Sequence, residues 1–204
     1  MKTNDNQLDR QFWDDRWNNG ETFWDLKSAS PPLISFFETI KDKNKRILIP
    51  GCGSAYEVEY LMQNGFTQVT VVDISPKLII QLLDRYQAYI GNGLTIICAD
   101  FFDLNGMYDY IIEQTFFCAL QPDLRVKYRE KMYALLRENG ILAGLLFGVD
   151  FPQGPPFGGS KQEYSDLFSS KFQEFKIEEC KMSVKPRMGT ELFFTALKDE
   201  ISFI

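Results

Sequence analysis

Two glycines, Gly51 and Gly53, stand between a short apolar run and a stretch with the composition of a helix. A glycine turn between a strand and a helix lets the backbone approach a ligand closely, because glycine has no side chain. A second apolar run ends on an acidic residue, Asp73, about 20 residues further on, the spacing typical of a carboxylate that binds ribose hydroxyls. The pattern predicts a nucleoside-containing cofactor at the carboxyl edge of a parallel sheet.

A third apolar run ends in Asp100 and Phe101, which are predicted to form an adenine pocket with Ile74. The end of the glycine turn then distinguishes between two cofactors. A dinucleotide needs a third glycine there, so that its pyrophosphate can lie against the start of the helix, and this chain has Ala55 and Tyr56 instead. Since S-adenosylmethionine has no phosphate, the turn favours it over a nicotinamide dinucleotide.

Three tryptophans, Trp13, Trp17 and Trp24, lie close together near the amino terminus. The first two are four residues apart, which places both rings on one face of a helix expected over residues 11–18. Packing in the core would explain any one of them. An aromatic cover over the cofactor explains the group as well, because aromatic faces, including that of Phe116, attract the positively charged sulfonium of S-adenosylmethionine.

The remaining apolar runs predict an α/β fold. Strands are expected at residues 47–49, 69–72, 94–99, 108–114 and 141–149. Helices are expected at residues 31–40, directly after the glycine turn, and at 76–90, 123–138 and 162–170. The last two β-like runs, 175–184 and 191–197, are joined by the five residues KPRMG, which predicts a hairpin and an antiparallel last strand.

Local signals at the helix ends add detail. Ser54 and Glu57 have the spacing of a capping box at the start of the helix that follows the glycine turn. Asn139 and Gly140 are expected to end the long helix that precedes the fifth strand. The helix after Ser75 is expected to bury a stripe of apolar side chains: Leu78, Leu82, Leu83 and Tyr86.

The chain also carries the motifs WDDRW, GETFWD, ILIPGCGSAYEV, VVDIS, ADFF and TFFCALQPDLR. With the spacing of the three tryptophans, these motifs resemble the thiopurine S-methyltransferase-like family, and its thiol and halide methyltransferase branch looks most similar. The resemblance covers about residues 12–198. It implies a Rossmann-like class I methyltransferase fold, with a seven-stranded, mostly parallel sheet, a C-terminal antiparallel hairpin strand and helices on both faces.

The resemblance further implies an S-adenosylmethionine-dependent methyltransferase, whose product is S-adenosyl-L-homocysteine. Its cofactor contacts fall on these positions: Trp13, Trp17, Trp24, Gly51, Asp73, Asp100 and Phe101. Cys52, Gly53 and Ile74 join them as neighbours in the glycine turn and the adenine pocket. Glu113, at the end of the fourth strand, is expected to hold the ammonium group of the donor, with proton acceptance as the alternative.

Two differences from the halide enzymes touch the expected acceptor pocket. The fourth strand ends in Glu113-Gln114-Thr115, where those relatives have Asp-Tyr-Val, and the loop GPPF places Phe157 where they have a tyrosine. The candidate pocket residues are Phe116, Phe157 and Arg187.

The type of reaction limits which chemical classes of acceptor are suitable. Methyl transfer from a sulfonium is an in-line displacement, for which the protein mainly aligns the nucleophile and excludes water. A thiol with a pKa of about 8.5 is partly thiolate at neutral pH and needs no strong base, which suits a chain without histidine. A thiol or hydrosulfide acceptor is therefore predicted. The alternatives are a halide or thiopurine acceptor, and a protein that binds S-adenosylmethionine without turnover.

Composition excludes several other classes. A net charge of −6 and a pI near 4.8 argue against a nucleic-acid partner, which requires clustered basic residues. The lack of histidine removes Ser-His-Asp chemistry and most catalytic zinc sites, so no metal is expected. No apolar run approaches the roughly 18 residues of a membrane span, and the polar first residues do not form a signal peptide.

Length and cysteine usage complete the sequence picture. The 204 residues suit one α/β domain, expected at residues 12–204, with a helical lid at 12–45 and a disordered tail at 1–11. The four cysteines form no CxxC pair and are expected as buried free thiols, which indicates a reducing, cytoplasmic location. A monomer that acts on a small-molecule acceptor, away from membranes, is expected.

Overall fold

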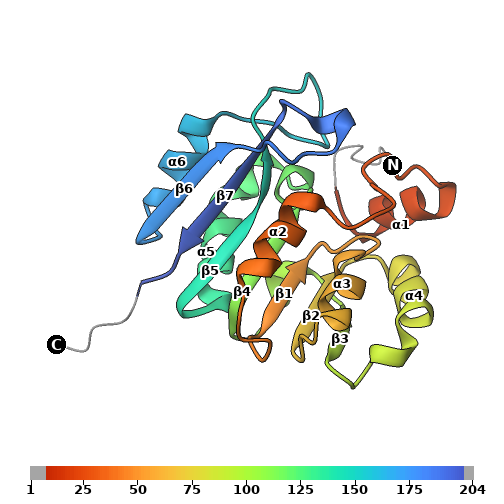
Figure 1. The fold of residues 1–204 in the computed structure, drawn as a ribbon. Helices are drawn as coiled ribbons and strands as arrows, with labels where there is room; N and C mark the ends of the chain where they lie inside the picture. Colours follow the sequence, from red (N-terminus) through yellow and green to blue (C-terminus); the bar gives the residue numbers. More distant parts are fainter. Residues whose placement is uncertain (1–7, 200–204) are drawn as a thin grey trace.

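A computed structural model describes residues 8–199 of the chain. Seven strands form one sheet (Figure 1): β1 Ile47–Pro50, β2 Val69–Asp73, β3 Leu94–Cys98, β4 Tyr108–Gln114, β5 Leu136–Phe147, β6 Glu174–Glu179 and β7 Glu191–Leu197. Their spatial order is β3-β2-β1-β4-β5-β7-β6. The strand order reverses between β1 and β4, and such switch points are where open α/β sheets bind ligands.

The pairing of the strands confirms the predicted topology. Every pair among β1 to β5 is parallel, whereas β7 is antiparallel to both of its neighbours, β5 and β6. The hairpin between β6 and β7 has a longer connection than the expected five residues. It covers residues 180–190 and contains the 3₁₀ helix η5, Lys185–Arg187, because β6 ends at Glu179.

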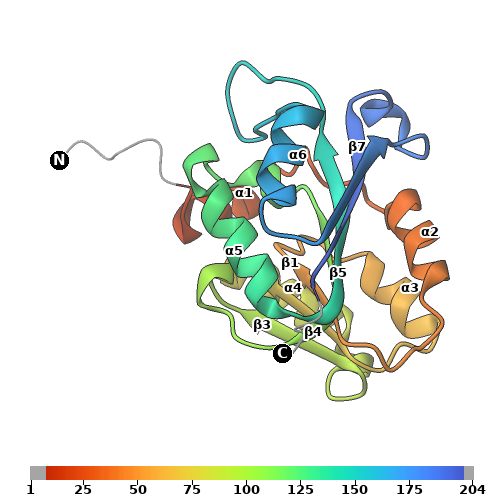
Figure 2. The ribbon, with the colours of Figure 1, turned by 90° about the vertical axis from the view of Figure 1, so that its left-hand side faces the viewer.

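Helices cover both faces of the sheet, as predicted (Figure 2). They are α1 Arg10–Asn19, α2 Pro31–Thr39, α3 Glu57–Gln63, α4 Pro76–Arg85, α5 Arg125–Leu135 and α6 Lys161–Ser169. α2, α3 and α4 bury side chains such as Phe37, Leu61 and Leu82 in one core. α5 and α6 bury Tyr128 and Phe168 in the core on the other face. Helix α1 packs beside α4 (Figure 1).

Two helix predictions were wrong at their ends. α4 ends at Arg85 rather than near residue 90, and Leu83 is 41% exposed rather than part of the buried stripe. The long helix ends at Leu135, because Leu136 already pairs with Tyr108 in the sheet. Asn139, with φ +58°, therefore lies in an irregular part of β5 where the register shifts, instead of ending a helix.

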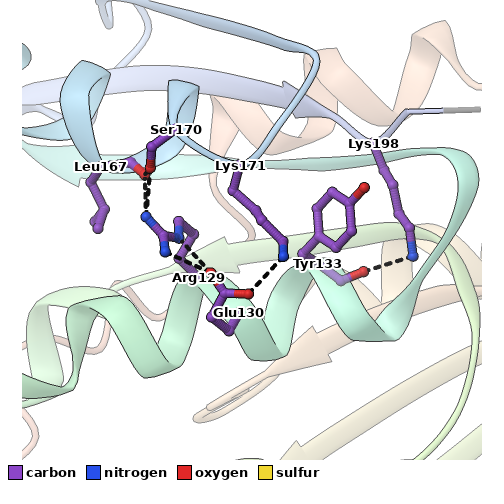
Figure 3. Close-up of polar contacts among 7 residues, drawn as sticks. All are labelled: Arg129, Glu130, Tyr133, Leu167, Ser170, Lys171 and Lys198. Atoms are coloured by element: carbon purple, nitrogen blue, oxygen red, sulfur yellow. Dashed lines mark hydrogen bonds and ion pairs between the residues drawn. The ribbon is translucent and has the colours of Figure 1, made fainter.

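Polar contacts link α5, α6 and the end of β7 (Figure 3). The Arg129 guanidinium donates hydrogen bonds to the Leu167 carbonyl (3.1 Å) and to the Ser170 hydroxyl (2.6 Å). The Lys198 ammonium donates to the carbonyls of Tyr133 (2.9 Å) and Leu136 (2.7 Å). Since the last carbonyls of a helix have no partner within it, these cations satisfy the carboxyl ends of α6 and α5.

Two predictions, that residues 1–11 are disordered and that the cysteines are buried, differ from the structure. The tail predicted as disordered, residues 1–11, overlaps α1, which begins at Arg10 and is capped by the Asp9 carboxylate; residues 1–7 lie outside the described part of the chain. All four cysteines are free, as expected, but Cys98 is exposed and Cys52 is only half-buried. No helix within residues 8–199 is long and apolar enough to cross a membrane.

Candidate active site

A cavity of about 820 Å³ opens at the carboxyl ends of β1, β2 and β4, and its volume is in the range of small-molecule sites. Nearly all predicted cofactor residues line it: Trp13, Trp17, Trp24, Gly51, Cys52, Gly53, Asp73, Ile74, Asp100 and Phe101. Phe116 and Arg187, predicted for the acceptor, line it as well. The cavity therefore brings together all but two of the residues that the sequence predicted for the site.

The glycine turn takes a conformation that few other residues would adopt. Gly51 (φ +54°) and Gly53 (φ +50°) alternate with ordinary residues, and Ala55 (φ +50°) continues the pattern. A Cβ atom on Gly51 would lie 2.1 Å from Cδ2 of Phe116, so a side chain has no room there. Gly51 thus brings the turn after β1 into contact with the turn after β4.

Asp73 ends β2 beside this turn. Its carboxylate accepts hydrogen bonds from the backbone N–H groups of Gly53 (3.2 Å) and Ser75 (3.0 Å). Burial raises the pKa of Asp73, and these backbone hydrogen bonds act in the opposite direction. The two N–H groups fix the orientation of a carboxylate that lines the cavity at the position expected for a ribose.

The three tryptophans gather at the cavity around Trp24. Its ring centroid lies 5.5 Å from that of Trp13 and 5.9 Å from that of Trp17, both in edge-to-face arrangements. Helix α1 is attached to the start of α4, because the Asp14 carboxylate accepts hydrogen bonds from the Ser75 hydroxyl and from the Lys77 N–H. All three indoles are half-buried, and all line the cavity.

The segment of residues 20–30, which joins α1 to α2 and is called the strap below, is held on both sides of the cavity. The Asp25 carboxylate accepts hydrogen bonds from the Ser54 hydroxyl (2.8 Å) and the Lys27 ammonium (2.9 Å). Burial alone would raise the pKa of Asp25, but these partners outweigh it and lower the pKa. From the opposite side, the Arg187 guanidinium donates to the Trp24 carbonyl (2.7 Å).

The capping-box prediction at the start of α3 was wrong. Ser54 bonds to Asp25 of the strap, as described above, instead of to the first turn of the helix. The Glu57 carboxylate accepts from the Ser30 N–H (2.9 Å), and α3 has no side-chain cap. Both side chains of the expected box therefore attach the strap to the glycine turn.

The cavity lining includes a set of mainly aromatic and proline side chains, called the acceptor half below after the role proposed for it: Phe116, Phe147, Phe151, Pro155, Pro156 and Arg187. The glycine turn, Asp73 and the tryptophans are called the donor half. Arg187 has a side chain only 10% exposed and pairs with Glu191 at 3.1 Å. Its guanidinium carbon lies 5.7 Å from the centroid of the Phe147 ring. Glu191 offsets part of the charge of Arg187, and the guanidinium keeps further N–H groups that can donate to an anion.

Two predicted residues do not line the cavity. Phe157 is half-buried in the loop before α6, where its N–H donates to the Cys118 carbonyl (2.7 Å). Glu113 is fully buried, and its carboxylate accepts from the N–H groups of Phe116 (3.0 Å) and Phe117 (3.1 Å). A carboxyl engaged by the backbone behind the cavity surface does not reach the donor's ammonium group.

Three residues that sequence reasoning did not select complete the site. Asp14 and Asp25 attach α1 and the strap, and Ser54 supplies the hydroxyl that Asp25 accepts. Both acids stand directly beside a predicted tryptophan, in WDDRW and FWD. An acidic residue next to a tryptophan is the sequence feature that could have identified Asp14 and Asp25, because an aromatic cover needs polar contacts to hold it in place.

Residues 8–201 match the family described as thiopurine S-methyltransferase (TPMT). The chain belongs to this family. Over 185 residues, covering 88% of this chain and 81% of its relative, it is 32% identical to a probable thiol methyltransferase 2 of Arabidopsis thaliana. It is 30% identical to thiocyanate methyltransferase 1 of Brassica oleracea, with 88% and 81% covered. Against a thiopurine S-methyltransferase of Xanthomonas campestris it is 29% identical, with 84% and 87% covered.

Solved structures agree on the fold. An enzyme described for the conversion of a disulfide bond into a thioacetal group during echinomycin biosynthesis has a TM-score of 0.76 at 20% identity, with 95% of this chain and 94% of that chain covered. The 1,6-didemethyltoxoflavin-N1-methyltransferase of Burkholderia thailandensis, solved with S-adenosylhomocysteine, has a TM-score of 0.73 at 20% identity, with 94% and 87% covered. The predicted class I methyltransferase fold is confirmed.

The TPMT family member described here is an S-adenosylmethionine-dependent methyltransferase, as predicted from the motifs. The residues present fit this cofactor. The cavity offers an oriented carboxylate, Asp73, a turn in which Gly53 leaves open space in place of a side chain, and a cluster of half-buried indoles. Those features match a ribose, a closely approaching methionine half and a sulfonium cation respectively.

Proposed function

We propose that this protein transfers a methyl group from S-adenosylmethionine to a small, soft anionic nucleophile, a thiolate or hydrosulfide. The observation that carries the proposal is Arg187, a buried cation set among aromatic and proline side chains at the acceptor half of the cavity. Soft anions lose less hydration free energy than oxyanions on entering such a site, and the Arg187 guanidinium offers them N–H donors beyond those that pair with Glu191 and the Trp24 carbonyl.

In the donor half, each residue has a positioning role. When bound, S-adenosylmethionine supplies an electrophilic methyl group on a positively charged sulfur that leaves readily. Asp73, Asp100 and Phe101 line the cavity. The Asp73 carboxylate would accept hydrogen bonds from the ribose hydroxyls, and Asp100 and Phe101 would hold the adenine. Trp13, Trp17 and Trp24 shield the sulfonium region from water and stabilise its charge through their ring faces.

In the acceptor half, Arg187 attracts the anion and Phe116 confines it against the donor half. No general base is required. The chain has no histidine, and burial raises the pKa of the Glu113 carboxyl to about 8, so Glu113 is mostly protonated at neutral pH. A thiol with a pKa near 8.5 supplies its own thiolate, and alignment within the cavity provides the rate enhancement.

The names of the relatives support this choice of acceptor. A thiol, a thiocyanate and a thiopurine methyltransferase stand among them, and a soft sulfur atom is common to all three acceptors.

We further propose that residues 12–204 act as one domain, with residues 12–45 as its lid, and that the protein works as a cytoplasmic monomer on a small molecule.

Labelled S-adenosylmethionine tests the proposal directly. Wild-type protein is incubated with hydrosulfide, benzenethiol, a thiopurine, thiocyanate and iodide, and with phenol as a hydroxyl control. Label is expected in the sulfur acceptors and not in phenol. Arg187→Met should raise KM for thiocyanate about tenfold or more, the effect of losing one charge-assisted contact. If no sulfur acceptor gains label, the assignment is wrong; tight donor binding without any transfer would indicate a binding protein.

A further inference from the structure

Glu113 lies behind the cavity surface and controls a strained turn. Thr115, two residues later, has φ +61°, a backbone conformation that a β-branched residue rarely adopts. The N–H groups of Phe116 and Phe117 directly after it both donate to one Glu113 carboxyl oxygen, Oε2, at 3.0 and 3.1 Å. The carboxyl thereby holds the turn closed from inside the protein.

This turn places the surface at which the two halves of the cavity meet. Thr115 and Phe116 line the cavity, and the Phe116 ring lies against Gly51, where a Cβ atom would be only 2.1 Å from it. A shift of the turn would therefore move Phe116 relative to the glycine turn. The alignment of acceptor and donor depends on this contact, because displacement reactions lose rate steeply when the reacting atoms are misplaced.

The surroundings of Glu113 favour a neutral carboxyl. Its side chain is fully buried, and β5 passes so closely that a Cβ atom on Gly144 would lie 2.2 Å from the Glu113 carbonyl oxygen. The other carboxyl oxygen, Oε1, has no hydrogen-bond partner among residues 8–199. Burial raises the pKa of Glu113 to about 8, the backbone hydrogen bonds lower it, and the nearby Glu191 carboxylate of β7 raises it further.

Among residues 8–199, the other groups facing Glu113 supply no cation to it. Cys118 of η3 (Phe117–Ala119), Tyr128 of α5 and Tyr164 of α6 each have their own pKa raised, by burial first and in part by Glu113. The Arg187 guanidinium of η5 pairs with Glu191, not with Glu113. An ionised Glu113 would therefore be an uncompensated buried charge near the acceptor half.

We propose that Glu113 is a positioning residue, a neutral carboxylic acid that holds the strained turn at Thr115 and so keeps Phe116 against Gly51. Its ionisation weakens catalysis in two ways. The buried charge attracts water into the packed turn or causes the turn to rearrange. It also repels an anionic acceptor that approaches Arg187. The kinetic consequence rests on the proposed function, whereas the protonation state of Glu113 does not.

The kinetic test uses thiocyanate, an acceptor that stays fully ionised across the pH range, so that the acceptor itself does not titrate, and any titration of the donor is the same for wild type and variants. Wild-type kcat/KM is expected to fall about tenfold from pH 7 to pH 9, since about a tenth of the carboxyl remains protonated one pH unit above its pKa. Glu113→Gln keeps a carbonyl oxygen for both N–H groups and cannot ionise, so its profile should stay flat within about twofold. Glu178→Gln, which neutralises an exposed carboxylate on β6, serves as the control and should keep the wild-type fall.

Thermal unfolding tests the same residue without any substrate. The raised pKa means that the native protein holds a proton which the unfolded chain releases near the ordinary value of 4.5. The stabilisation is thus complete below about pH 4.5 and is lost as the pH rises through about 8. Between pH 5 and about pH 8.5 the wild-type unfolding midpoint should fall relative to that of Glu113→Gln, and equal slopes would overturn the proposal.

A third measurement does not need the variant to fold. In wild-type protein labelled with ¹³C at the glutamate carboxyl, one resonance should titrate near pH 8. If no glutamate titrates above about pH 7, Glu113 is not a neutral clamp. If thiocyanate and every sulfur acceptor remain unmethylated while this titration is present, the proposed function fails and the assignment of Glu113 stands. Identical pH profiles in wild type and Glu113→Gln, with transfer intact, would refute the positioning role.

Discussion

The two halves of the cavity differ in how they are built. In the donor half, Gly51, Asp73 and Asp100 stand at the ends of neighbouring parallel strands, and backbone N–H groups orient the Asp73 carboxylate. In the acceptor half, the lining comes from the turn after β4, the loop between β5 and α6, and η5. The donor half thus follows from the sheet itself, whereas the acceptor half depends on connections that vary without disturbing the sheet.

This difference explains how one fold keeps a single methyl donor and changes its acceptor. A cofactor bound by strand ends is retained whenever the sheet forms, because parallel strands present their carboxyl ends at one edge. The acceptor pocket can change with a few loop residues. The relatives with thiol, thiocyanate and thiopurine in their names fit that pattern.

The largest effect should come from the point where the halves touch. Gly51→Ala places a Cβ atom 2.1 Å from the Phe116 ring at a φ of +54°. Backbone strain and overpacking together should lower the free energy of unfolding by about 2–5 kcal/mol. Gly53→Ala is the matched control, because it has φ +50° but no atom within 4 Å of the added Cβ, so only about 1–2 kcal/mol should be lost. Chemical denaturation without ligand measures both. Equal losses would mean that the contact with Phe116 is unimportant.

A smaller effect is expected within the donor half alone. Asp73→Asn keeps one carbonyl oxygen but removes the charge that strengthens hydrogen bonds to ribose hydroxyls. Affinity for S-adenosylhomocysteine should fall about tenfold to a hundredfold, measured by calorimetry. Asp109→Asn is the control: this acid lies in β4, accepts hydrogen bonds from the Lys45 ammonium and the Arg46 N–H just before β1, and does not line the cavity. Unchanged affinity in Asp73→Asn would remove the ribose role and with it the main distinction between the halves.

The smallest effect should come from the anchor of the strap. Ser54→Ala removes the 2.8 Å hydrogen bond to Asp25, whose side chain is only 4% exposed. About 1 kcal/mol of stability should be lost, together with a few-fold loss of donor affinity, because the strap carries Trp24. Ser165→Ala, on the exposed face of α6, removes a hydroxyl that bonds only within its own helix and should change neither quantity. Thermal unfolding with and without S-adenosylhomocysteine separates the two losses.

The fold could be predicted almost completely, because its signals are local. Each apolar run is a strand, and the order of strands and helices permits few topologies. The errors occur where a distant partner competes with a local pattern. Leu136 continues into the sheet rather than the helix because Tyr108 pairs with it. Ser54 leaves its expected cap because Asp25, 29 residues earlier, accepts its hydrogen bond.

The same distinction applies to the site. The donor residues could be found from spacing, because strand ends fix their positions. The role proposed for Glu113 could not be predicted from the sequence. The sequence places this residue at a strand end, but it does not show whether the side chain points into the cavity or back into the core. Arg187 was selected only by position. Its burial depends on Glu191 and on the Trp24 carbonyl 163 residues away, a contact that no pattern of neighbours encodes.

That contact between Arg187 and the strap has a consequence for how the two substrates influence one another. The guanidinium proposed to face the methyl acceptor also holds the backbone of the strap, which carries Trp24. Occupancy of either half then stabilises the position of the group on which the other depends. By thermodynamic linkage, the factor by which bound donor strengthens acceptor binding equals the factor by which bound acceptor strengthens donor binding. The enzyme would thereby bind S-adenosylmethionine more tightly when a methyl acceptor is present and more weakly when none is.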